Sequence, residues 1–278
     1  MNNRIAVAND ISGLGKCSLA VNIPIFASFG FEACAIPTAV LTNQSCYDTY
    51  YIQNYKVDFT QYHEAWKKSR VNLCGIYSGY FACADDVKSF FENFIENKDC
   101  IYVNDPVMGD LGERYSNCTD EMIEEMRRTV YCSDVTTPNL TELCLLTDSD
   151  FSKISKNITE NNIEQMIKPL AEKLIQNGTK NVVVTGIKCV GKDDMLYNAI
   201  ISKDEFTVVS DEKIKGDFSG TGDIFSSILA CFVFKKENII NGVKKACSFI
   251  KTGIMHTDKT NENDGISFEK ILSQIEKL

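Results

Sequence analysis

The segment Gly216–Asp223 places two glycines, a threonine and an aspartate directly before an apolar helical stretch, Ile224–Phe234. The glycines allow tight turns, and a new helix presents unpaired N–H groups and its positive dipole end. Such a loop suits a phosphate, or the charge on a phosphoryl group in transfer. Asp223, in the first helical turn, could then accept a proton from a hydroxyl group. The alternative from this loop alone is an ordinary helix start below a glycine turn. It is not a Walker A loop, because no Gly-Lys-Ser/Thr follows.

Two further carboxylates follow one predicted strand, Cys100–Asn104. Asp105 and Asp110 lie five residues apart in a loop that contains proline and glycine. Together they could hold a hydrated Mg²⁺ and so neutralise triphosphate charge. The alternative is turn chemistry, since aspartate and glycine are common loop residues.

A second helix start follows the predicted strand Asp134–Thr137. Thr137 is predicted to be its N-cap, with proline at the first helical position. Asn139 and Glu142 then lie three residues apart on one helical face, where they could reach a phosphate or a metal-bound water. Glu142 could equally be an ordinary first-turn carboxylate.

Two other strand ends carry polar residues. Thr185 ends the predicted strand Asn181–Thr185, and its hydroxyl could contact a nucleotide phosphate or simply cap the strand. The segment Asn9–Gly15 follows the first predicted strand, where polar groups such as Asp10 would line the ligand cleft of a parallel sheet. A glycine-rich turn without a ligand is the alternative, and the spacing does not fit a Gly-x-Gly-x-x-Gly fingerprint.

Strand-like and helix-like segments alternate along the chain, which predicts one α/β domain over residues 1–278 with a largely parallel sheet. Strands are expected at Arg4–Asn9, Ala33–Pro37, Val71–Tyr77, Cys100–Asn104, Asp134–Thr137, Asn181–Thr185, Met195–Ser202 and Glu205–Ile214. Helices are expected at Ser18–Phe29 (broken early by Pro24), Gln61–Arg70, Asp85–Glu96, Asp120–Val130, Glu160–Gln176, Gly222–Phe234, Ile239–His256 and Ser267–Lys277.

Composition and charge narrow the class of protein. The 278 residues carry 29 Lys and Arg against 38 Asp and Glu, a net charge of −9, which argues against a general nucleic-acid binder. No apolar run reaches membrane-spanning length, and the start lacks the apolar core of a signal peptide, so we expect a cytoplasmic protein. The 12 Cys are scattered without a Cys-x-x-Cys pair and accompany only two His, which predicts reduced thiols rather than a structural zinc site.

Taken together, these segments resemble the ribokinase-like superfamily, and most closely its pyridoxal (pyridoxamine) kinase branch. The matching segments, in order, are Asn9–Gly15, Pro37–Tyr47, Ser78–Tyr80, Asp105–Asp110, Thr137–Glu142, Val182–Gly186 and Gly220–Asp223. The resemblance implies a three-layer sandwich with helices on both faces of the sheet. It also implies ATP-dependent phosphorylation of the 5′-hydroxymethyl group of a vitamin B6 vitamer, in B6 salvage, by a homodimer. ATP and Mg²⁺ are then required, and relatives often require a monovalent cation such as K⁺.

The resemblance also implies a role for each site residue, with Asp223 as the base that accepts the hydroxyl proton. The backbone of Gly220, Thr221 and Gly222 would form the anion hole for the γ-phosphate. The remaining phosphate and metal residues would be Asn139, Thr185 and Thr221 for ATP, and Asp105, Asp110 and Glu142 for Mg²⁺. The B6 vitamer would contact Asp10, Ser45, Tyr80 and Tyr115, the last within a flexible flap, Leu111–Cys118.

Two departures keep alternatives open. Many pyridoxal kinases read Ser-His-Val where this chain has Asp10-Ile11-Ser12, a form similar to a bacterial pyridoxamine-kinase subgroup and to the start of hydroxymethylpyrimidine kinases. Those kinases typically end the catalytic loop in Gly-Thr-Gly-Cys, so Asp223 favours the pyridoxal branch. The alternatives are a hydroxymethylpyrimidine kinase or another small-molecule kinase on this fold, and a non-catalytic B6-binding protein. A sugar kinase is disfavoured because no large insertion lies between Ala39 and Cys74.

Overall fold

The computed structural model describes residues 3–53, 55–216, 218–258 and 262–275, which form parts of two compact units. Unit 1 comprises Met1–Phe81 and Ile214–Leu278, and unit 2 comprises Ala82–Lys213. Each unit has its own section of sheet and its own helices. The expected single domain over residues 1–278 stays a prediction, and Asp217, beside the predicted phosphate loop, lies outside the described residues.

Unit 1 contains three parallel strands, β1 (Arg4–Ser12), β2 (Glu32–Leu41) and β3 (Gly75–Ser78), with β1 in the middle. Ile5 to Ala8 of β1 are fully buried, as expected for a strand covered on both faces. The pairing of β1 with β2 shifts register between Asn9 and Ile11. Such an irregularity re-aims side chains at a strand end, and here it falls beside Asp10.

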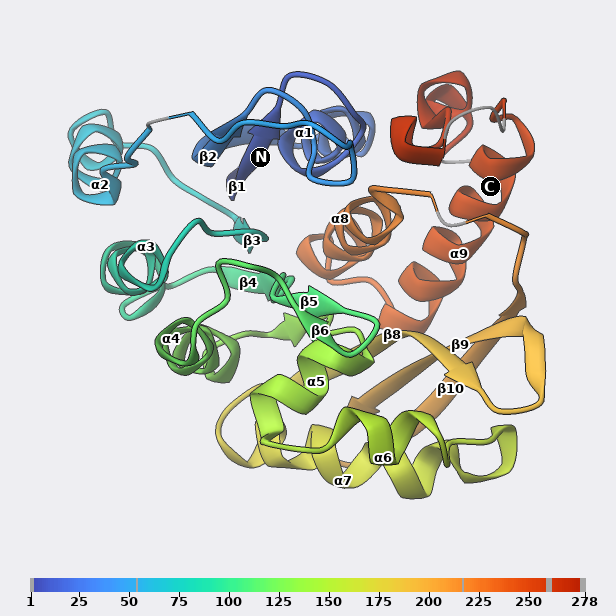
Figure 1. Ribbon diagram of the computed structural model, residues 1–278. Coiled ribbons are helices and arrows are strands. Elements are labelled where there is room, and N and C mark those ends of the chain that lie inside the picture. Colours follow the sequence, from blue (N-terminus) through green and yellow to red (C-terminus); the bar gives the residue numbers. More distant parts are fainter. Residues whose placement is uncertain (1–2, 54, 217, 259–261, 276–278) are drawn as a thin grey trace. The chain divides into compact units, whose positions relative to one another are not determined.

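The helices of unit 1 are α1 (Ser18–Ser28), α2 (Phe59–Lys68), α8 (Thr221–Phe234) and α9 (Ile239–Met255). Helix α8 packs against α1 and α9 (Figure 1), and its buried apolar residues continue all round the helix, as expected for a core helix. The prediction that Pro24 breaks the first helix is wrong. Helix α1 continues through Pro24 because its packing against β1, β2 and α8 outweighs the lost backbone hydrogen bond.

The end of unit 1 also differs from expectation. The predicted helix Ser267–Lys277 is wrong: its described part forms two separate 3₁₀ turns, Phe268–Lys270 and Leu272–Gln274. Phe268, Ile271 and Ile275 are buried. These apolar side chains, whose spacing resembles that of a helix, therefore anchor the 3₁₀ turns instead. Another 3₁₀ turn, Glu262–Asp264, precedes them.

The main sheet section of unit 2 contains five strands in the order β4-β7-β8-β9-β10. Their bounds are β4 (Ile101–Asn104), β7 (Val135–Thr136), β8 (Asn181–Cys189), β9 (Lys192–Ser202) and β10 (Phe206–Glu212). β4, β7 and β8 run parallel, whereas β8, β9 and β10 form antiparallel neighbours. With the parallel strands of unit 1, this confirms the predicted α/β class with a largely parallel sheet.

The helices of unit 2 surround its strands and hold a small hairpin. They are α3 (Ala84–Phe90), α4 (Asp120–Tyr131), α5 (Leu140–Thr147), α6 (Phe151–Ser155) and α7 (Ile163–Gln176). A π-helical turn, Phe91–Ile95, extends α3, and a 3₁₀ turn, Glu160–Asn162, precedes α7. The hairpin consists of β5 (Gly109–Asp110) and β6 (Glu113–Arg114), and it contacts α5.

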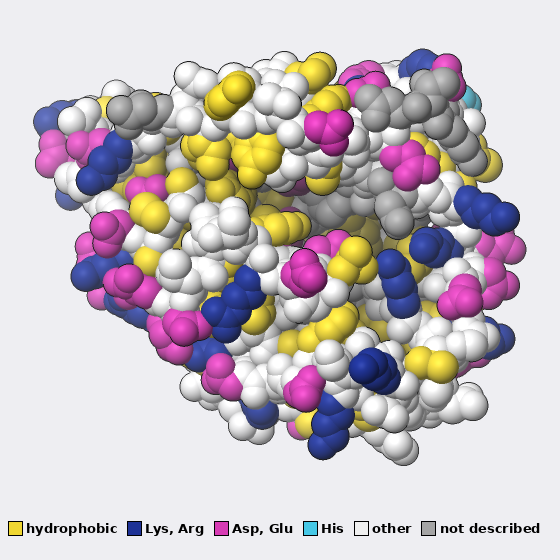
Figure 2. All heavy atoms as spheres, in the orientation of Figure 1, with side chains coloured by type: hydrophobic (Ala, Val, Ile, Leu, Met, Phe, Trp, Pro, Cys, Tyr) yellow, Lys and Arg dark blue, Asp and Glu magenta, His cyan; other side chains and the backbone are white. Residues whose placement is uncertain are grey.

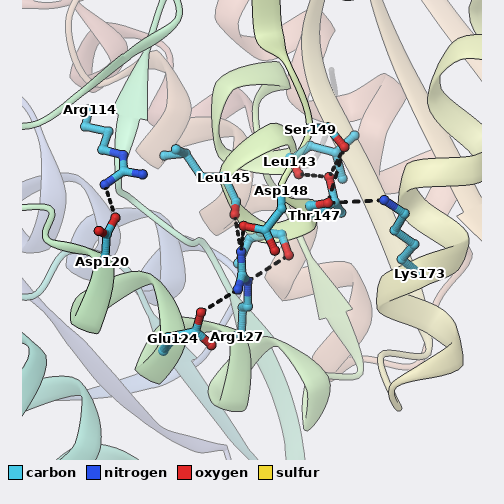
Figure 3. A network of polar contacts seen from close by, with 11 residues as sticks. Arg114, Asp120, Glu124, Arg127, Leu143, Leu145, Thr147, Asp148, Ser149 and Lys173 are labelled. Carbon is cyan, nitrogen blue, oxygen red and sulfur yellow. Dashed lines mark hydrogen bonds and ion pairs between the residues drawn. The ribbon is translucent and has the colours of Figure 1, made fainter.

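Two cations fix the C-terminal end of α5 (Figure 3). The Arg127 guanidinium donates to the carbonyls of Leu145 at 2.7 Å and Leu146 at 2.9 Å, and it pairs with Asp148. Lys173 donates to the carbonyl of the last helical residue at 3.2 Å. Positive charge at a helix C-terminus is favourable because it complements the dipole. The orientation of α5, which carries predicted site residues at its other end, is therefore held by its neighbours.

The surface carries charges of both signs. On the face drawn in Figure 2, Lys and Arg side chains lie interspersed with Asp and Glu. All twelve cysteines carry free thiols, as the sequence predicts. Among the described helices, none combines the length and apolar character needed to cross a membrane.

Candidate active site

The predicted phosphate loop of unit 1 runs into α8 at Thr221, and Gly220 is the helix N-cap. Gly220 has φ +76°, and a Cβ placed on it would lie 1.8 Å from the carbonyl oxygen of Lys16. Only glycine fits there, because the left-handed conformation and the close backbone both exclude a side chain. A Cβ on Gly222, in contrast, would meet no atom within 4 Å. The first turn of α8, whose N–H groups lack helical partners, therefore begins beside open space.

Asp223 lies in that first turn, as predicted, and its side chain is partly accessible. Burial raises the pKa of its carboxyl, and two hydrogen bonds oppose this shift. They come from the backbone N–H of Ser18 and from the Asn9 amide, whose Nδ2 lies 3.2 Å from Oδ1 of Asp223. Hydrogen-bond donors that contact a carboxylate favour its ionised form, and Asp223 must be ionised in order to accept a proton.

Asp10 is a buried carboxylate at the end of β1. It accepts hydrogen bonds from the hydroxyls of Ser18 and, at 3.4 Å, Ser12. Its pKa is raised to about 6, mainly by burial and further by the charge of Asp223, while the Ser18 hydroxyl lowers it. The structure therefore brings Asp10 and Asp223 into one cluster, in which both carboxylates are costly to ionise.

Ser18 joins the two acids from the start of α1. Its hydroxyl donates to Asp10 and its backbone N–H donates to Asp223. It does so at φ +51°, in the left-handed region that residues other than glycine rarely adopt, and such conformations concentrate at functional sites. The neighbouring Cys17 has its pKa raised to about 12 by burial and by the charges of Asp223 and Asp10. Its thiol therefore stays protonated and is no nucleophile.

The other predicted vitamer residues of unit 1 differ in their placement. The backbone of Tyr80 is fixed beside the cluster, because its N–H donates to Asn9 Oδ1 at 2.8 Å and its carbonyl accepts from Thr38 at 2.6 Å. Ser45 lies exposed in the loop after β2. The sequence interpretation did not assign roles to Asn9 or Ser18. Their place in or beside the polar segment Asn9–Gly15 was the available signal.

In unit 2, Asn139 and Glu142 form a capping box at the start of α5. Asn139 accepts from the Glu142 N–H at 3.0 Å, and Glu142 Oε2 accepts from the Asn139 N–H at 2.8 Å. The prediction that Thr137 is the N-cap is wrong, because the capping box starts the helix two residues later. The Thr137 hydroxyl instead donates to Asp105 at 3.0 Å, which brings Asp105 to the same helix start.

The loop after β4 is attached to this helix start. Glu142 Oε1 accepts from the Met108 N–H at 3.1 Å, and Asn139 Nδ2 donates to the Gly109 carbonyl at 2.8 Å. Burial raises the pKa of Glu142 well above its usual range, and the charges of Asp105 and Asp110 raise it further. Asp110 itself is exposed. Within the described parts of the chain, no three His, Cys, Asp or Glu side chains lie close enough to hold a metal ion directly.

The two remaining predicted residues of unit 2 are Thr185 and Tyr115. Thr185 forms an isolated parallel β-bridge with Asn139, and the Thr185 N–H donates to the Pro138 carbonyl at 2.9 Å. Asn139 and Thr185 are thus brought together, as their shared predicted role requires. Tyr115 directly follows β6, where its N–H donates to the Met108 carbonyl at 2.9 Å while its side chain is 42% exposed. It belongs to the exposed hairpin segment of unit 2.

Comparisons with known proteins agree on one family. The family model described as "Phosphomethylpyrimidine kinase" matches residues 22–267. A pyridoxal kinase of Dictyostelium discoideum is 27% identical over 186 residues, which is 63% of this chain and 58% of that protein. The three curated relatives are covered over 58%, 50% and 65% of their own length, so this chain spans about half to two thirds of them.

Solved structures are similar over nearly the whole chain. A "putative phosphomethylpyrimidine kinase" from Bacteroides thetaiotaomicron, crystallised with pyridoxal, is 28% identical with a TM-score of 0.87, covering 99% of this chain and 96% of that one. Pyridoxal kinase from Entamoeba histolytica shares the fold at 21% identity and a TM-score of 0.85, with coverage of 99% and 96%. The fold is thus ribokinase-like. Because the family model matches most of its length, the chain belongs to the phosphomethylpyrimidine kinase family.

Proposed function

We propose that this protein transfers the γ-phosphoryl group of ATP to the 5′-hydroxymethyl group of a vitamin B6 vitamer: pyridoxal, pyridoxamine or pyridoxine. The observation that carries the proposal is Asp223 in the first turn of α8. It follows a loop that only glycine can form at Gly220, and it accepts two hydrogen bonds that favour its charged form. A partly accessible carboxylate held in this way suits a base that accepts a hydroxyl proton.

In the proposed phosphoryl transfer, one bond forms as another breaks, and this chain supplies the group that accepts the proton. The vitamer hydroxyl oxygen forms a bond to the γ-phosphorus, the bond between that phosphorus and the bridging oxygen breaks, and ADP leaves with the electron pair. The hydroxyl proton passes to Asp223. Because phosphoryl transfer is largely dissociative, Asp223 need only orient the hydroxyl and accept its proton late. The backbone N–H groups of Gly220, Thr221 and Gly222 would stabilise the charge on the transferring group.

Unit 2 would supply the nucleotide side. Asn139 and Thr185 would contact the ATP phosphates. The donors Asp105, Asp110 and Glu142 fit a hydrated Mg²⁺, because a hard cation prefers carboxylate oxygens. Burial chiefly raises the pKa of Glu142 and the charges of Asp105 and Asp110 raise it further, so a nearby cation would offset an unfavourable negative charge. Each Glu142 oxygen accepts one backbone N–H and keeps a lone pair for a metal-bound water. When bound, Mg²⁺ would neutralise triphosphate charge.

In unit 1, the vitamer side would be formed by Asp10 and Tyr80, with Ser45 from an exposed loop. Asp10, whose pKa is about 6, could pair with a cationic pyridine nitrogen or amine. The relatives support this choice of substrate, since one is named pyridoxal kinase and the Bacteroides structure contains pyridoxal. By the same resemblance, we propose a cytoplasmic homodimer, which sedimentation of the purified protein would test.

Hydroxymethylpyrimidine is the second candidate substrate, and the description of the matching family favours it. A coupled ADP-release assay with Mg·ATP decides between them, using pyridoxal, pyridoxamine, pyridoxine, hydroxymethylpyrimidine and ribose, each with and without K⁺. Turnover of a B6 vitamer at micromolar concentration supports the proposal. Activity on hydroxymethylpyrimidine alone would move the assignment to that substrate, and inactivity on all five would leave a non-catalytic binding protein.

A further inference from the structure

The side-chain amide of Asn9 makes four hydrogen bonds at the end of β1. Its oxygen accepts from the backbone N–H groups of Asp10 at 3.0 Å and Tyr80 at 2.8 Å. Its nitrogen donates to Asn22 Oδ1 at 2.9 Å and to Asp223 Oδ1 at 3.2 Å. Asn9 is fully buried. An asparagine amide has two hydrogens and two lone pairs, so the hydrogen-bonding capacity of Asn9 is fully used.

The orientation of this amide has a single solution. Backbone N–H groups only donate, so the side of the Asn9 amide that faces Asp10 and Tyr80 must be its oxygen. The assignment of oxygen and nitrogen, which is often ambiguous for asparagine, is therefore fixed by the main chain. The N–H groups of Asn9 must then face Asp223 and Asn22.

Packing prevents the amide from turning. A Cβ placed on Gly79 would lie 2.6 Å from the Asn9 amide nitrogen, so the backbone of β3's end lies directly against it. On the other side, Asn22 accepts from Asn9 and donates to Ser227 Oγ at 2.8 Å. Asn22 and Ser227 are also fully buried. The chain of contacts Ser227–Asn22–Asn9–Asp223, here called the amide relay, therefore connects the core face of α8 to the carboxylate on its first turn.

We propose that Asn9 is a positioning residue that holds the Asp223 carboxylate through the amide relay and ties it to the backbone of the Asp10 and Tyr80 segments. This inference rests on the proposed function of Asp223 as the proton acceptor. A neutral donor suits the task because it orients a carboxylate without adding charge beside the transferring phosphoryl group. One amide thereby sets the position of the base relative to the two segments of unit 1 assigned to the vitamer.

The electrostatics of the cluster support this role. Burial raises the pKa of Asp223, whereas the Asn9 and Ser18 donors lower it. Among the residues that the structure describes, Asp10 on β1 and the Cys17 thiol before α1 are titratable groups that interact electrostatically with Asp223. Asp10 is negative when ionised and Cys17 stays neutral, so neither stabilises the charge on Asp223. Asn9 and Ser18 are therefore donors that lower the pKa of Asp223 against the effect of burial.

Asn9→Asp is the primary test because it changes one atom. The oxygen that faces the Asp10 and Tyr80 N–H groups is kept and can still accept from both, while the introduced oxygen replaces the amide nitrogen that donates to Asp223 and Asn22. We expect kcat to fall about tenfold or more, which corresponds to losing a hydrogen bond to a charged group. The acid limb of the kcat–pH profile should move about one unit to higher pH. KM for ATP should stay unchanged, since the phosphate residues remain intact.

A second measurement does not depend on turnover. With ¹³Cγ-labelled aspartate, NMR titration follows the Asp223 carboxyl directly, and its resonance is assigned by its loss in Asp223→Asn. In Asn9→Asp, the apparent pKa of the pair that contains Asp223 should rise by about one unit. If the wild-type protein phosphorylates none of the substrates, the proposed function fails, and this titration still decides whether Asn9 controls Asp223.

Ser227→Ala tests the far end of the amide relay and keeps the inference falsifiable if Asn9→Asp does not fold. It removes the acceptor of Asn22, and we expect the same shifts in kcat and in the Asp223 titration at about a third of the size, because the effect is indirect. Ser133→Ala is the matched control: Ser133 is an equally buried serine of unit 2 that donates to Val130. Unchanged titration of Asp223 in both relay variants, or equal changes in Ser133→Ala, overturns the proposal.

Discussion

Replacing Asp10 by asparagine should stabilise the protein at neutral pH. The folded protein holds Asp10 with a pKa of about 6, against an ordinary value of 3.8, chiefly because burial disfavours its charge. Asparagine has the same shape. Its oxygen can still accept from the Ser18 hydroxyl, and its N–H can donate to the Ser12 hydroxyl that lies 3.4 Å from the present carboxylate. The substitution therefore removes the buried charge and keeps the hydrogen bonds.

The sign and size of the stability change in Asp10→Asn follow from proton linkage. Between pH 3.8 and about 6 the folded protein binds the Asp10 proton more tightly than the unfolded chain does, so the stability from Asp10 is fully present below pH 3.8 and is lost as pH rises through about 6. A difference of about two pKa units corresponds to about 3 kcal/mol. An asparagine side chain at this position cannot titrate, so Asp10→Asn should match the wild type near pH 3.8 and exceed its stability by up to about 3 kcal/mol at pH 8.

Urea denaturation from pH 4 to pH 8 measures this difference. Trp66, the single tryptophan of the chain, lies in α2 of unit 1, so its fluorescence reports on the unit that contains Asp10. Asp134→Asn is the control with the opposite sign; because Asp134 lies in unit 2, far-UV circular dichroism follows the unfolding of this variant and of the wild type. Burial acts to raise the pKa of Asp134, but Lys180, the Tyr102 N–H and Lys98 outweigh it and lower the pKa, so this control should lose stability above pH 4. A gain for Asp10→Asn that does not grow with pH would refute the reasoning.

Three further predictions follow from the site and from the helices that hold it. Asp223→Asn should lower turnover about 10²- to 10⁴-fold with nucleotide binding retained; calorimetric titration with ATP checks the binding, and a loss of turnover below tenfold would remove Asp223 as the base. Gly220→Ala should lower the free energy of unfolding by about 1–3 kcal/mol because of its left-handed φ alone. Gly222→Ala should change the free energy of unfolding by no more than about 1 kcal/mol. Equal shifts in the thermal midpoint of the two variants would contradict the geometry. Arg127→Met should lower the free energy of unfolding by about 1–3 kcal/mol, because the Arg127 side chain is only 12% exposed and caps α5 (Figure 3). Arg114→Met should lower it by only about 0–1 kcal/mol, because the Arg114 side chain is 45% exposed. Urea midpoints that do not differ between the two variants would count against the capping role.

Local signals in the sequence were sufficient for much of the fold. The β-branched run Asn181–Thr185 forms the first part of β8, and Gly178 follows the end of α7 as a stop signal. The loop Gly220–Asp223 does start a helix with Asp223 in its first turn. In each case the determining contacts lie within a few residues, so the type and spacing of neighbours are enough.

The errors arise where distant contacts compete with local preference. Pro24 is a strong local breaker, yet helix packing keeps α1 continuous. Thr137 has good N-cap chemistry, but its hydroxyl donates to Asp105, and Asn139 caps the helix instead. The segment from Ser267 has helical apolar spacing, and its buried residues are accommodated by 3₁₀ turns.

The α/β class, the order of the polar strand ends and the identity of the carboxylates could be predicted from the residues alone. How those groups are charged and held depends on the folded protein. The pKa of Asp10 depends on burial and on Asp223, which lies more than two hundred residues away in the chain. The amide relay joins β1, α1 and α8, and no local pattern marks Asn22 or Ser227 as part of it. Burial, charge and hydrogen-bond direction are properties of the folded neighbourhood, and they exist only once distant segments have packed together.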